Sequence, residues 1–422
     1  MAALRSVCIP VLGVFFVFGC ASHKPGAGGT SGQGGHGGDT TGTVGAPVGA
    51  AGDTGGAGTT TPDPGAAGAS GGGGASATAG AAGHQVVDAG LEASLEGPPA
   101  PIGDPGTMGD GDLTISPPYT TQPDLTDKGN PKGKSFQFSM SSAQSALFKG
   151  NDPTLKVANQ KPFTRRIDVY VPAQYKDGTP APVLVIQDGP GELGLVKNAL
   201  DNLTISKDPA RTLPAFIAIA VANGGGDAQG SERGLEYDTM SGKYATFVDT
   251  EVLPAVVANP MVKAAFPKLS FTTNPEGRAA LGCSSGGAAA LAMGWFRPDL
   301  FHRIITYSGT LVAQQNSIAP EHATFPDGAW DYHSEVQLIA NSPRKDLRVF
   351  LNANEMDNGA SSAEAGHHNW VIANQRTSAA LAAKGYHERF IFAKGVGHCD
   401  GSVRNATLAD SLVWVWRGFP AP

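Results

Sequence analysis

The chain has few charged residues, few cysteines and no run of basic residues. Its 422 residues include four cysteines, and Asp, Glu, Lys and Arg make up 16%, with a formal net charge of −7. Proteins that bind nucleic acids carry a basic patch or stripe that neutralises phosphates. The charge distribution therefore argues against direct nucleic-acid binding.

Apolar side chains are scarce in residues 21 to about 110, which are rich in Gly, Ala, Thr and Ser. Such a tract cannot bury a core and behaves as a flexible tether. The residues that follow are numerous enough for one large α/β core. We therefore predict a signal peptide at 1–19, a lipidated cysteine and low-complexity linker at 20–111, and one folded domain at 112–422.

The apolar run at residues 7–18 is too short to span a bilayer but has the length of a signal-peptide core. It ends at Gly19-Cys20, which resembles a bacterial lipobox and implies lipidation of Cys20. Ala21 in the next position implies retention at the outer membrane. We expect an exported protein that is anchored to the cell envelope by lipid, with an ordinary secretory signal as the alternative.

From about residue 134, β-rich runs alternate with helical stretches. This alternation predicts a mostly parallel sheet with helices on both faces. Together with a serine elbow after a central strand, at Ser284, it is the plan of an α/β-hydrolase. The expected strands are 166–171, 183–187, 216–221, 279–283, 303–307, 348–352 and 389–393. The expected helices are 193–203, 244–258, 286–296, 370–384 and 405–416. The segment before about residue 165 is expected to add one or two antiparallel strands.

A G-x-S-x-G pattern lies between an expected strand and an expected helix, at Gly282-Cys283-Ser284-Ser285-Gly286. In a nucleophile elbow a strand turns sharply into a helix and exposes the serine hydroxyl. The pattern also occurs around Ser70, but there it lies in the linker without a preceding strand. Ser284 is therefore the candidate nucleophile.

A serine nucleophile needs a histidine base, and the base needs an acid that orients it. In this fold the chain order is serine, acid, histidine. Of the histidines in the folded domain, only His398 lies in a glycine-rich loop after the last expected strand. Two carboxylates follow the preceding strand: we favour Asp357, and Glu355 remains open. Asp400 is the weakest candidate because it is almost adjacent to His398 along the chain.

The oxyanion hole should take one N–H group from Ser285 and another from the loop Asp188-Gly189-Pro190-Gly191, which follows the strand at 183–187. Pro190 has no N–H group. The second donor is then Gly189, Gly191 or a neighbour, and we assign Gly189.

Neither a cofactor nor a metal ion is expected. Residues 189–194 match G-x-G-x-x-G after a strand, but the next strand ends in Ala222-Asn223-Gly224 without the acidic residue of a dinucleotide site. His367-His368 and His398-x-Asp400 lack a third ligand at a recognisable spacing.

Cys283 directly precedes Ser284, and Cys399 directly follows His398. If Ser284 and His398 are within hydrogen-bonding reach, their neighbours are drawn together as well. An exported protein meets an oxidising compartment. We therefore predict a Cys283–Cys399 disulfide.

Over residues 165–418 the chain resembles the putative esterase family of α/β-hydrolases, which includes enterochelin esterases and feruloyl esterases. The resemblance lies in residues 183–189 and 278–287, Arg233-x-x-Glu236-Tyr237-Asp238, Glu251-Val252-Leu253-Pro254, Arg297-Pro298-Asp299-x-Phe301, Ser308-Gly309, Asn369-Trp370, Ala373-Asn374, Gly385-Tyr386, Gly397-His398 and Trp414-x-Trp416-Arg417.

The resemblance implies a serine carboxylester hydrolase that carries Ser284, Asp357 and His398. Its substrate would be a carbohydrate, phenolic or siderophore ester, as a small molecule or linked to a polysaccharide. The cysteines beside Ser284 and His398 are similar to those of glucuronoyl esterases. Those enzymes place a basic residue after the serine where this chain has Ser285, which departs from a uronate-ester site.

Two pairs of residues have open roles. Arg233 and Glu236 could form a structural ion pair or face the substrate, and we favour the structural pair because residues three apart on a helix are neighbours. Trp330 and Trp370 could stack on a sugar or a phenol, or pack in the core. An acyltransferase and a non-catalytic surface binding module on the same scaffold remain alternatives to the esterase.

Overall fold

The computed structural model describes residues 106–420, apart from residue 335. The signal peptide at 1–19, the lipidation site Cys20, Ser70 and nearly all of the linker at 20–111 lie outside the described residues. Within the described part, no helix combines the length and the apolar character that a membrane crossing requires.

The described chain forms a mixed nine-stranded sheet in the order β1-β11-β10-β9-β8-β5-β6-β3-β2. All seven expected strands are present. The nine strands are β1 (Gly111–Ile115), β2 (Lys134–Ser141), β3 (Thr164–Val171), β5 (Val183–Ile186), β6 (Ile217–Val221), β8 (Arg278–Cys283), β9 (Arg303–Tyr307), β10 (Arg348–Met356) and β11 (His387–Gly397). The short strands β4 (Pro180–Ala181) and β7 (Ser270–Phe271) pair separately.

The segment before residue 165 contributes one antiparallel strand, as expected, and one parallel strand, which was not expected. β2 pairs antiparallel with β3, and β3 pairs antiparallel with β6. β1, in contrast, lies at the opposite edge and pairs in parallel with β11. The sequence of a five-residue strand does not specify which edge of a sheet the strand joins. The outer edge of β11 presents backbone N–H and C=O groups with which any strand that reaches it can pair.

The helices are α1 (Leu193–Leu203), α2 (Glu232–Tyr237), α3 (Lys243–Phe247), α4 (Leu253–Ala258), α5 (Pro260–Ala265), α6 (Ser285–Phe296), α7 (Leu338–Asn341), α8 (Trp370–Ala383) and α9 (Gly401–Val415). The helix expected at 244–258 is divided by a π-helical turn, Val248–Val252. Pro254 lies just after this turn and has no N–H group for the regular ladder, so the hydrogen-bond pattern widens there.

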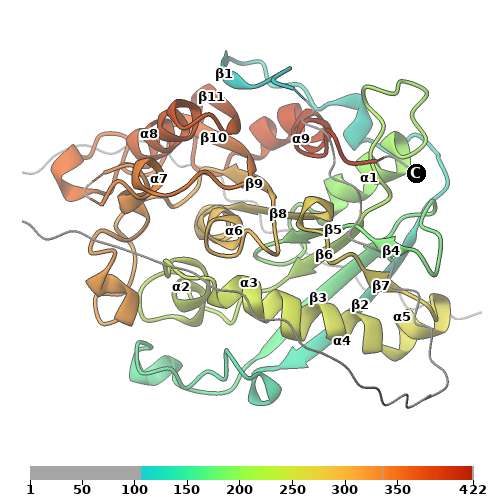
Figure 1. The fold of residues 1–422 in the computed structure, drawn as a ribbon, viewed down its shortest axis with the longest axis horizontal. Helices are drawn as coiled ribbons and strands as arrows, with labels where there is room; N and C mark the ends of the chain where they lie inside the picture. The colour runs from blue at the N-terminus through green and yellow to red at the C-terminus, as the bar shows by residue number, and fades with distance from the viewer. Residues whose placement is uncertain (1–105, 335, 421–422) are drawn as a thin grey trace, which may run out of the picture. The chain divides into compact units, whose positions relative to one another are not determined.

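Two apolar cores lie on the two faces of the sheet. In β5, Val183 and Val185 belong to the core under α3, α4, α6 and α8, and Leu184 and Ile186 belong to the core under α1 and α9 (Figure 1). Successive side chains of a strand point to opposite faces. Strands that are buried on both sides read as continuous apolar runs, which explains the sequence of the central strands.

The direction in which strands are added reverses between β5 and β8. From β5 the chain moves to β6 on one side, and β8, β9, β10 and β11 then build the sheet on the other side. In open α/β sheets, ligands bind outside the carboxyl ends of the strands at such a switch point. The segments that follow β5, β8, β9, β10 and β11 are therefore gathered at one edge.

Candidate active site

Ser284 occupies the sharp turn between β8 and α6. Its backbone has φ 59° and ψ −132°, a conformation that residues other than glycine rarely adopt. The turn is tight because β8 and the start of α6 nearly touch: a Cβ atom at Gly282 would lie 2.2 Å from the carbonyl oxygen of Gly286. This is the geometry expected of a nucleophile elbow.

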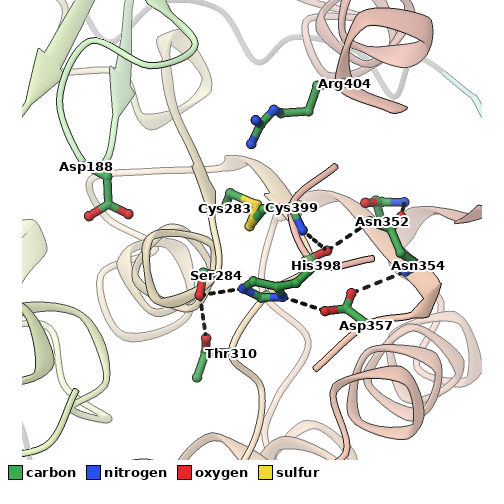
Figure 2. Close-up of a disulfide and its surroundings, with 12 residues drawn as sticks. Asp188, Cys283, Ser284, Thr310, Asn352, Asn354, Asp357, His398, Cys399 and Arg404 are labelled. Carbon is green, nitrogen blue, oxygen red and sulfur yellow. Dashed lines mark hydrogen bonds and ion pairs between the residues drawn. A yellow bond between two sulfur atoms is a disulfide. The ribbon is translucent and has the colours of Figure 1, made fainter. Parts of the chain in front are cut away.

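Ser284, His398 and Asp357 form one hydrogen-bonded chain (Figure 2). Ser284 Oγ lies 2.9 Å from His398 Nε2, and His398 Nδ1 lies 2.5 Å from Asp357 Oδ1. An ionised carboxylate only accepts hydrogen bonds, so Nδ1 carries the proton and Nε2 can accept from the serine hydroxyl. The imidazole is 22% exposed and the carboxylate 0%, so that the imidazole is accessible to solvent and the carboxylate is shielded from it.

The structure brings Asp357, and neither of the alternative acids, to His398. The backbone amides of Asn354 and Asn358 donate to Asp357 at 3.3 and 2.9 Å. Glu355 is exposed and accepts from the amide of Gly395 at 2.8 Å. Asp400 accepts from the amide of Ser402 and caps the start of α9.

A second set of hydrogen bonds holds the backbone on both sides of His398. The side-chain amide of Asn354 donates to the carbonyl of Gly397 at 2.5 Å, and the amide of Cys399 donates to Ser308 Oγ at 3.1 Å. Asn354 belongs to β10, and Ser308 directly follows β9. The loop of the base is thus fixed to the strands that carry the rest of the site.

Cys283 and Cys399 form a disulfide, with Cα atoms 6.1 Å apart and a sequence separation of 116. The bond joins the end of β8 to the segment after β11 (Figure 2). It therefore ties the backbone next to Ser284 to the backbone next to His398.

Of the two N–H groups expected to form the oxyanion hole, only one is available to a substrate in the structure. The amide of Ser285 lies in the first turn of α6, where helix amides have no intrahelical acceptor. Gly189, however, is not a free donor, because its amide donates to the carbonyl of Val221 at 3.0 Å. The amide of Asp188 donates to Tyr237 Oη at 3.1 Å. In the loop from Asp188 to Gly191, this leaves Gly191 as the candidate second donor.

The expected Arg233–Glu236 pair does not form. Arg233 binds Asp188 with Nε–Oδ1 and Nη2–Oδ2 distances of 2.8 and 2.9 Å, and Glu236 is held by the buried Arg165 at 2.5 Å. The short helix α2 lies between β3 and the loop after β5, so each side chain reaches a partner from another element. The expected pairing of Arg233 with Glu236 is therefore wrong.

Asp238, the last residue of the Arg233–Asp238 motif, is buried beside Ser285. Burial raises the pKa of its carboxyl group to about 7, against the opposing effects of Ser285 and the positive charge of Arg233. A titratable group therefore lies next to the residue that follows the nucleophile.

Of the two alternatives for Trp330 and Trp370, the structure shows packing in the core. Trp330 is fully buried and stacks on His367, with ring centroids 4.8 Å apart. Trp370 is 9% exposed and packs edge-to-face against His398. His367 pairs with Asp327 at 3.1 Å, and no group of three metal-ligating side chains suited to an ion occurs among the residues described by the structure.

Sequence reasoning missed Thr310. Its Oγ1 atom lies 3.4 Å from Ser284 Oγ (Figure 2). The available signal was its position: Ser308-Gly309-Thr310 directly follows β9, the neighbour of the nucleophile strand β8. The carboxyl ends of adjacent parallel strands meet at the same edge.

Comparisons with known proteins identify the family. The model of the putative esterase family matches residues 162–398, more than half of the chain. Among curated proteins, no match to the sequence is found.

Several solved structures are similar at low identity. A ferulic acid esterase shares 19% identity, with 68% of this chain and 100% of that chain covered and a TM-score of 0.46. The enterobactin esterase from Shigella flexneri, in the presence of enterobactin, shares 19% over 67% of this chain and 58% of its own length, with a TM-score of 0.41. A feruloyl esterase module from Clostridium thermocellum, complexed with sinapinate, shares 15% over 71% and 94%, with a TM-score of 0.44. The family match, together with the α/β-hydrolase fold of the chain, shows that the chain belongs to the putative esterase family and is a carboxylic ester hydrolase.

Proposed function

We propose that the protein is an extracytoplasmic serine esterase in which Ser284, His398 and Asp357 form the catalytic triad. The observation that carries the proposal is the continuous chain of hydrogen bonds from Ser284 Oγ through both ring nitrogens of His398 to the buried Asp357. A nucleophile, a base within reach and a group that orients the base are the parts that acyl transfer requires.

In the proposed reaction, Ser284 Oγ forms a bond to the ester carbonyl carbon as its proton passes to His398 Nε2. Asp357 stabilises the imidazolium and keeps its own charge. The carbonyl oxygen becomes an oxyanion that the Ser285 amide can stabilise. His398 then gives its proton to the departing alcohol, and a water molecule, deprotonated by His398, releases the acid from the acyl-enzyme.

The proposed location rests on the N-terminal sequence and on the disulfide. Residues 7–18 with Cys20 have the pattern of an exported lipoprotein, and a disulfide persists in oxidising compartments. A Cys20→Ala variant should move from the membrane fraction to the soluble exported fraction. Retention of this variant in the membrane fraction would contradict a lipid anchor.

The proposed substrate is a carbohydrate, phenolic or siderophore ester. The experiment is a panel of feruloyl, acetyl-sugar, uronate and catecholate-lactone esters, together with labelling by a fluorophosphonate probe. Ser284→Ala should abolish hydrolysis and labelling, whereas Ser70→Ala removes the serine of the other G-x-S-x-G copy and should change neither.

Full activity of Ser284→Ala would refute the proposed triad. Transfer to an alcohol acceptor in preference to water would instead indicate an acyltransferase. A wild-type protein that neither hydrolyses any ester nor takes the label would indicate a binding module.

A further inference from the structure

Several residues of the family resemblance have no role in the triad. They lie in Ser308-Gly309, Asn369-Trp370 and Ala373-Asn374, which belong to the segment after β9 and to the start of α8. In the structure these two segments meet beside Ser284, with Thr310 between them.

Thr310 is held against the nucleophile by its backbone as well as its side chain. Its amide donates to the carbonyl of Ser284 at 3.0 Å, and its hydroxyl lies 3.4 Å from Ser284 Oγ. The residue is 1% exposed. A hydroxyl that is fixed so closely to the nucleophile cannot rotate away into solvent.

The indole of Trp370 determines how the Thr310 hydroxyl is used. Trp370 Nε1 lies 3.2 Å from Thr310 Oγ1, and an indole N–H can only donate. Thr310 Oγ1 therefore accepts from Trp370 and keeps its own proton for another acceptor. The proton of Ser284 is directed to His398 Nε2, which leaves a lone pair of Ser284 Oγ to accept from Thr310.

Asn374 locks the two segments together. Its side-chain amide donates to the carbonyl of Gly309 and to the carbonyl of Trp370, each at 2.8 Å. Asn374 is fully buried. The donor Trp370 and the hydroxyl of Thr310 are thus held in one arrangement by the side chain of Asn374.

We propose that Thr310 is a further catalytic residue, whose hydroxyl donates a hydrogen bond to Ser284 Oγ and whose direction of donation is fixed by Trp370. The inference rests on the proposed function. As His398 withdraws the proton of Ser284, negative charge develops on Oγ before its bond to the carbonyl carbon is complete and the charge passes to the carbonyl oxygen. The Thr310 hydroxyl stabilises this developing charge without giving up its own proton. The bond is long in the resting enzyme and shortens as the charge develops. Trp370 is a positioning residue that acts through Thr310.

The test compares kcat, KM and the rate of fluorophosphonate labelling on an aryl ester that the wild type hydrolyses. Thr310→Val keeps the shape and removes the hydroxyl, and it should lower kcat and the labelling rate by about 10- to 100-fold with KM changed by less than about threefold. Thr310→Ser restores the hydroxyl and should recover activity to within roughly threefold of the wild type. Trp370→Phe should lower kcat by about three- to tenfold.

The double variant distinguishes a directed pair from two independent contacts. Phenylalanine keeps an aromatic ring against His398 and removes the indole N–H that binds Thr310, so the Thr310→Val/Trp370→Phe enzyme should be no slower than Thr310→Val to within about twofold. Thr377→Val is the matched control, since Thr377 is buried in α8 and its hydroxyl has no hydrogen-bond partner in the described part of the chain. It should leave kcat unchanged.

The outcomes separate this inference from the proposed function. If the wild type is active and Thr310→Val matches it, or if Thr310→Ser is as slow as Thr310→Val, the role of Thr310 is refuted and the triad stands. Losses that multiply in the double variant refute the role of Trp370. If the wild type neither hydrolyses an ester nor takes the label, the proposed function fails and this inference fails with it.

Discussion

His398 Nδ1 lies 2.5 Å from Oδ1 of Asp357, whose side chain is completely shielded from solvent. Two backbone amides also donate to the carboxylate, that of Asn354 to Oδ2 and that of Asn358 to Oδ1. The carboxylate can therefore set both the orientation and the tautomer of the imidazole, which is what a base needs in order to accept a proton at Nε2.

Asp357→Asn should lower kcat by about 10³- to 10⁴-fold, because an amide in this position no longer holds the required tautomer of His398. The measurement is the steady-state hydrolysis of a short aryl ester. Glu355→Gln is the matched control two residues earlier, and it should stay within about threefold of the wild type because Glu355 accepts from the amide of Gly395 rather than from His398. The reverse ranking of the two variants would assign the acid to Glu355.

Replacement of both disulfide cysteines, Cys283→Ala with Cys399→Ala, should lower the free energy of unfolding by roughly 3–5 kcal/mol, because the bond closes a long loop in the unfolded chain. The loop spans 116 residues. Denaturant titration with and without a reductant measures the effect: the reductant should shift the midpoint of the wild type but not that of the variant. Equal midpoints for the oxidised wild type and the variant would show that the bond adds no stability.

Gly282→Ala should destabilise the fold by about 1–3 kcal/mol and lower kcat at least tenfold, because the new Cβ atom would displace the turn that carries Ser284. A Cβ atom at Gly282 would lie 2.2 Å from the backbone of Gly286, whereas one at Gly194 in α1 would meet nothing within 4 Å. Gly194→Ala should therefore leave activity intact and raise stability by up to about 1 kcal/mol. Thermal unfolding and initial rates test both variants, and equal behaviour would contradict the close approach at the elbow.

Glu388 should make the stability of the protein depend on pH. Burial in β11, reinforced by Asp112 and Asp110, raises the pKa of its carboxyl group from 4.5 to about 7, although a hydrogen bond from Ser378 opposes the shift. At a pH between these two pKa values, the carboxyl group of Glu388 is therefore protonated in the folded state and ionised in the unfolded state. The stabilisation from Glu388 is complete below pH 4.5 and is lost as the pH rises through about 7.

When the pH is raised from about 4 to about 8.5, the free energy of unfolding of Glu388→Gln should therefore rise relative to that of the wild type, by at most about 3 kcal/mol. Chemical denaturation at the two pH values measures the difference. The exposed carboxylate Asp346 supplies the control, since Asp346→Asn should follow the wild type at both values. A constant difference between Glu388→Gln and the wild type would refute the raised pKa.

The strand order of the sheet illustrates what local sequence can predict. The seven expected strands were found because buried strands are short apolar runs, rich in β-branched residues and bounded by turn residues, and these are local signals. The partner of β1 was not predictable in this way, since pairing with β11 joins segments more than 270 residues apart in sequence, as Gly111 and Arg389 show. The π-helical turn before Pro254 was missed for another reason: a single missing N–H group changes the hydrogen-bond pattern but not the apolar pattern.

The choice between Asp357 and Glu355 needed the tertiary structure. Both follow the strand expected at 348–352, and residue type and spacing do not separate them. β10 ends at Met356, so Asp357 lies in the turn beyond the strand and reaches His398, while Glu355 points to Gly395. The oxyanion assignment failed for a similar reason, because only the folded chain places the carbonyl of Val221 in front of the Gly189 amide.

The sequence by itself determined the candidate nucleophile and base, the acid to within two residues, and the cysteines beside them. A strand, a Gly-bounded serine and a following helix are local signals, and they specify the elbow without knowledge of distant contacts. The tertiary structure alone decided which hydroxyl and which amides lie within hydrogen-bonding distance of Ser284 and His398. Those distances depend on how β8, β9, β10 and β11 end at one edge of the sheet, and a hydrogen bond is lost over a fraction of an ångström that no sequence pattern records.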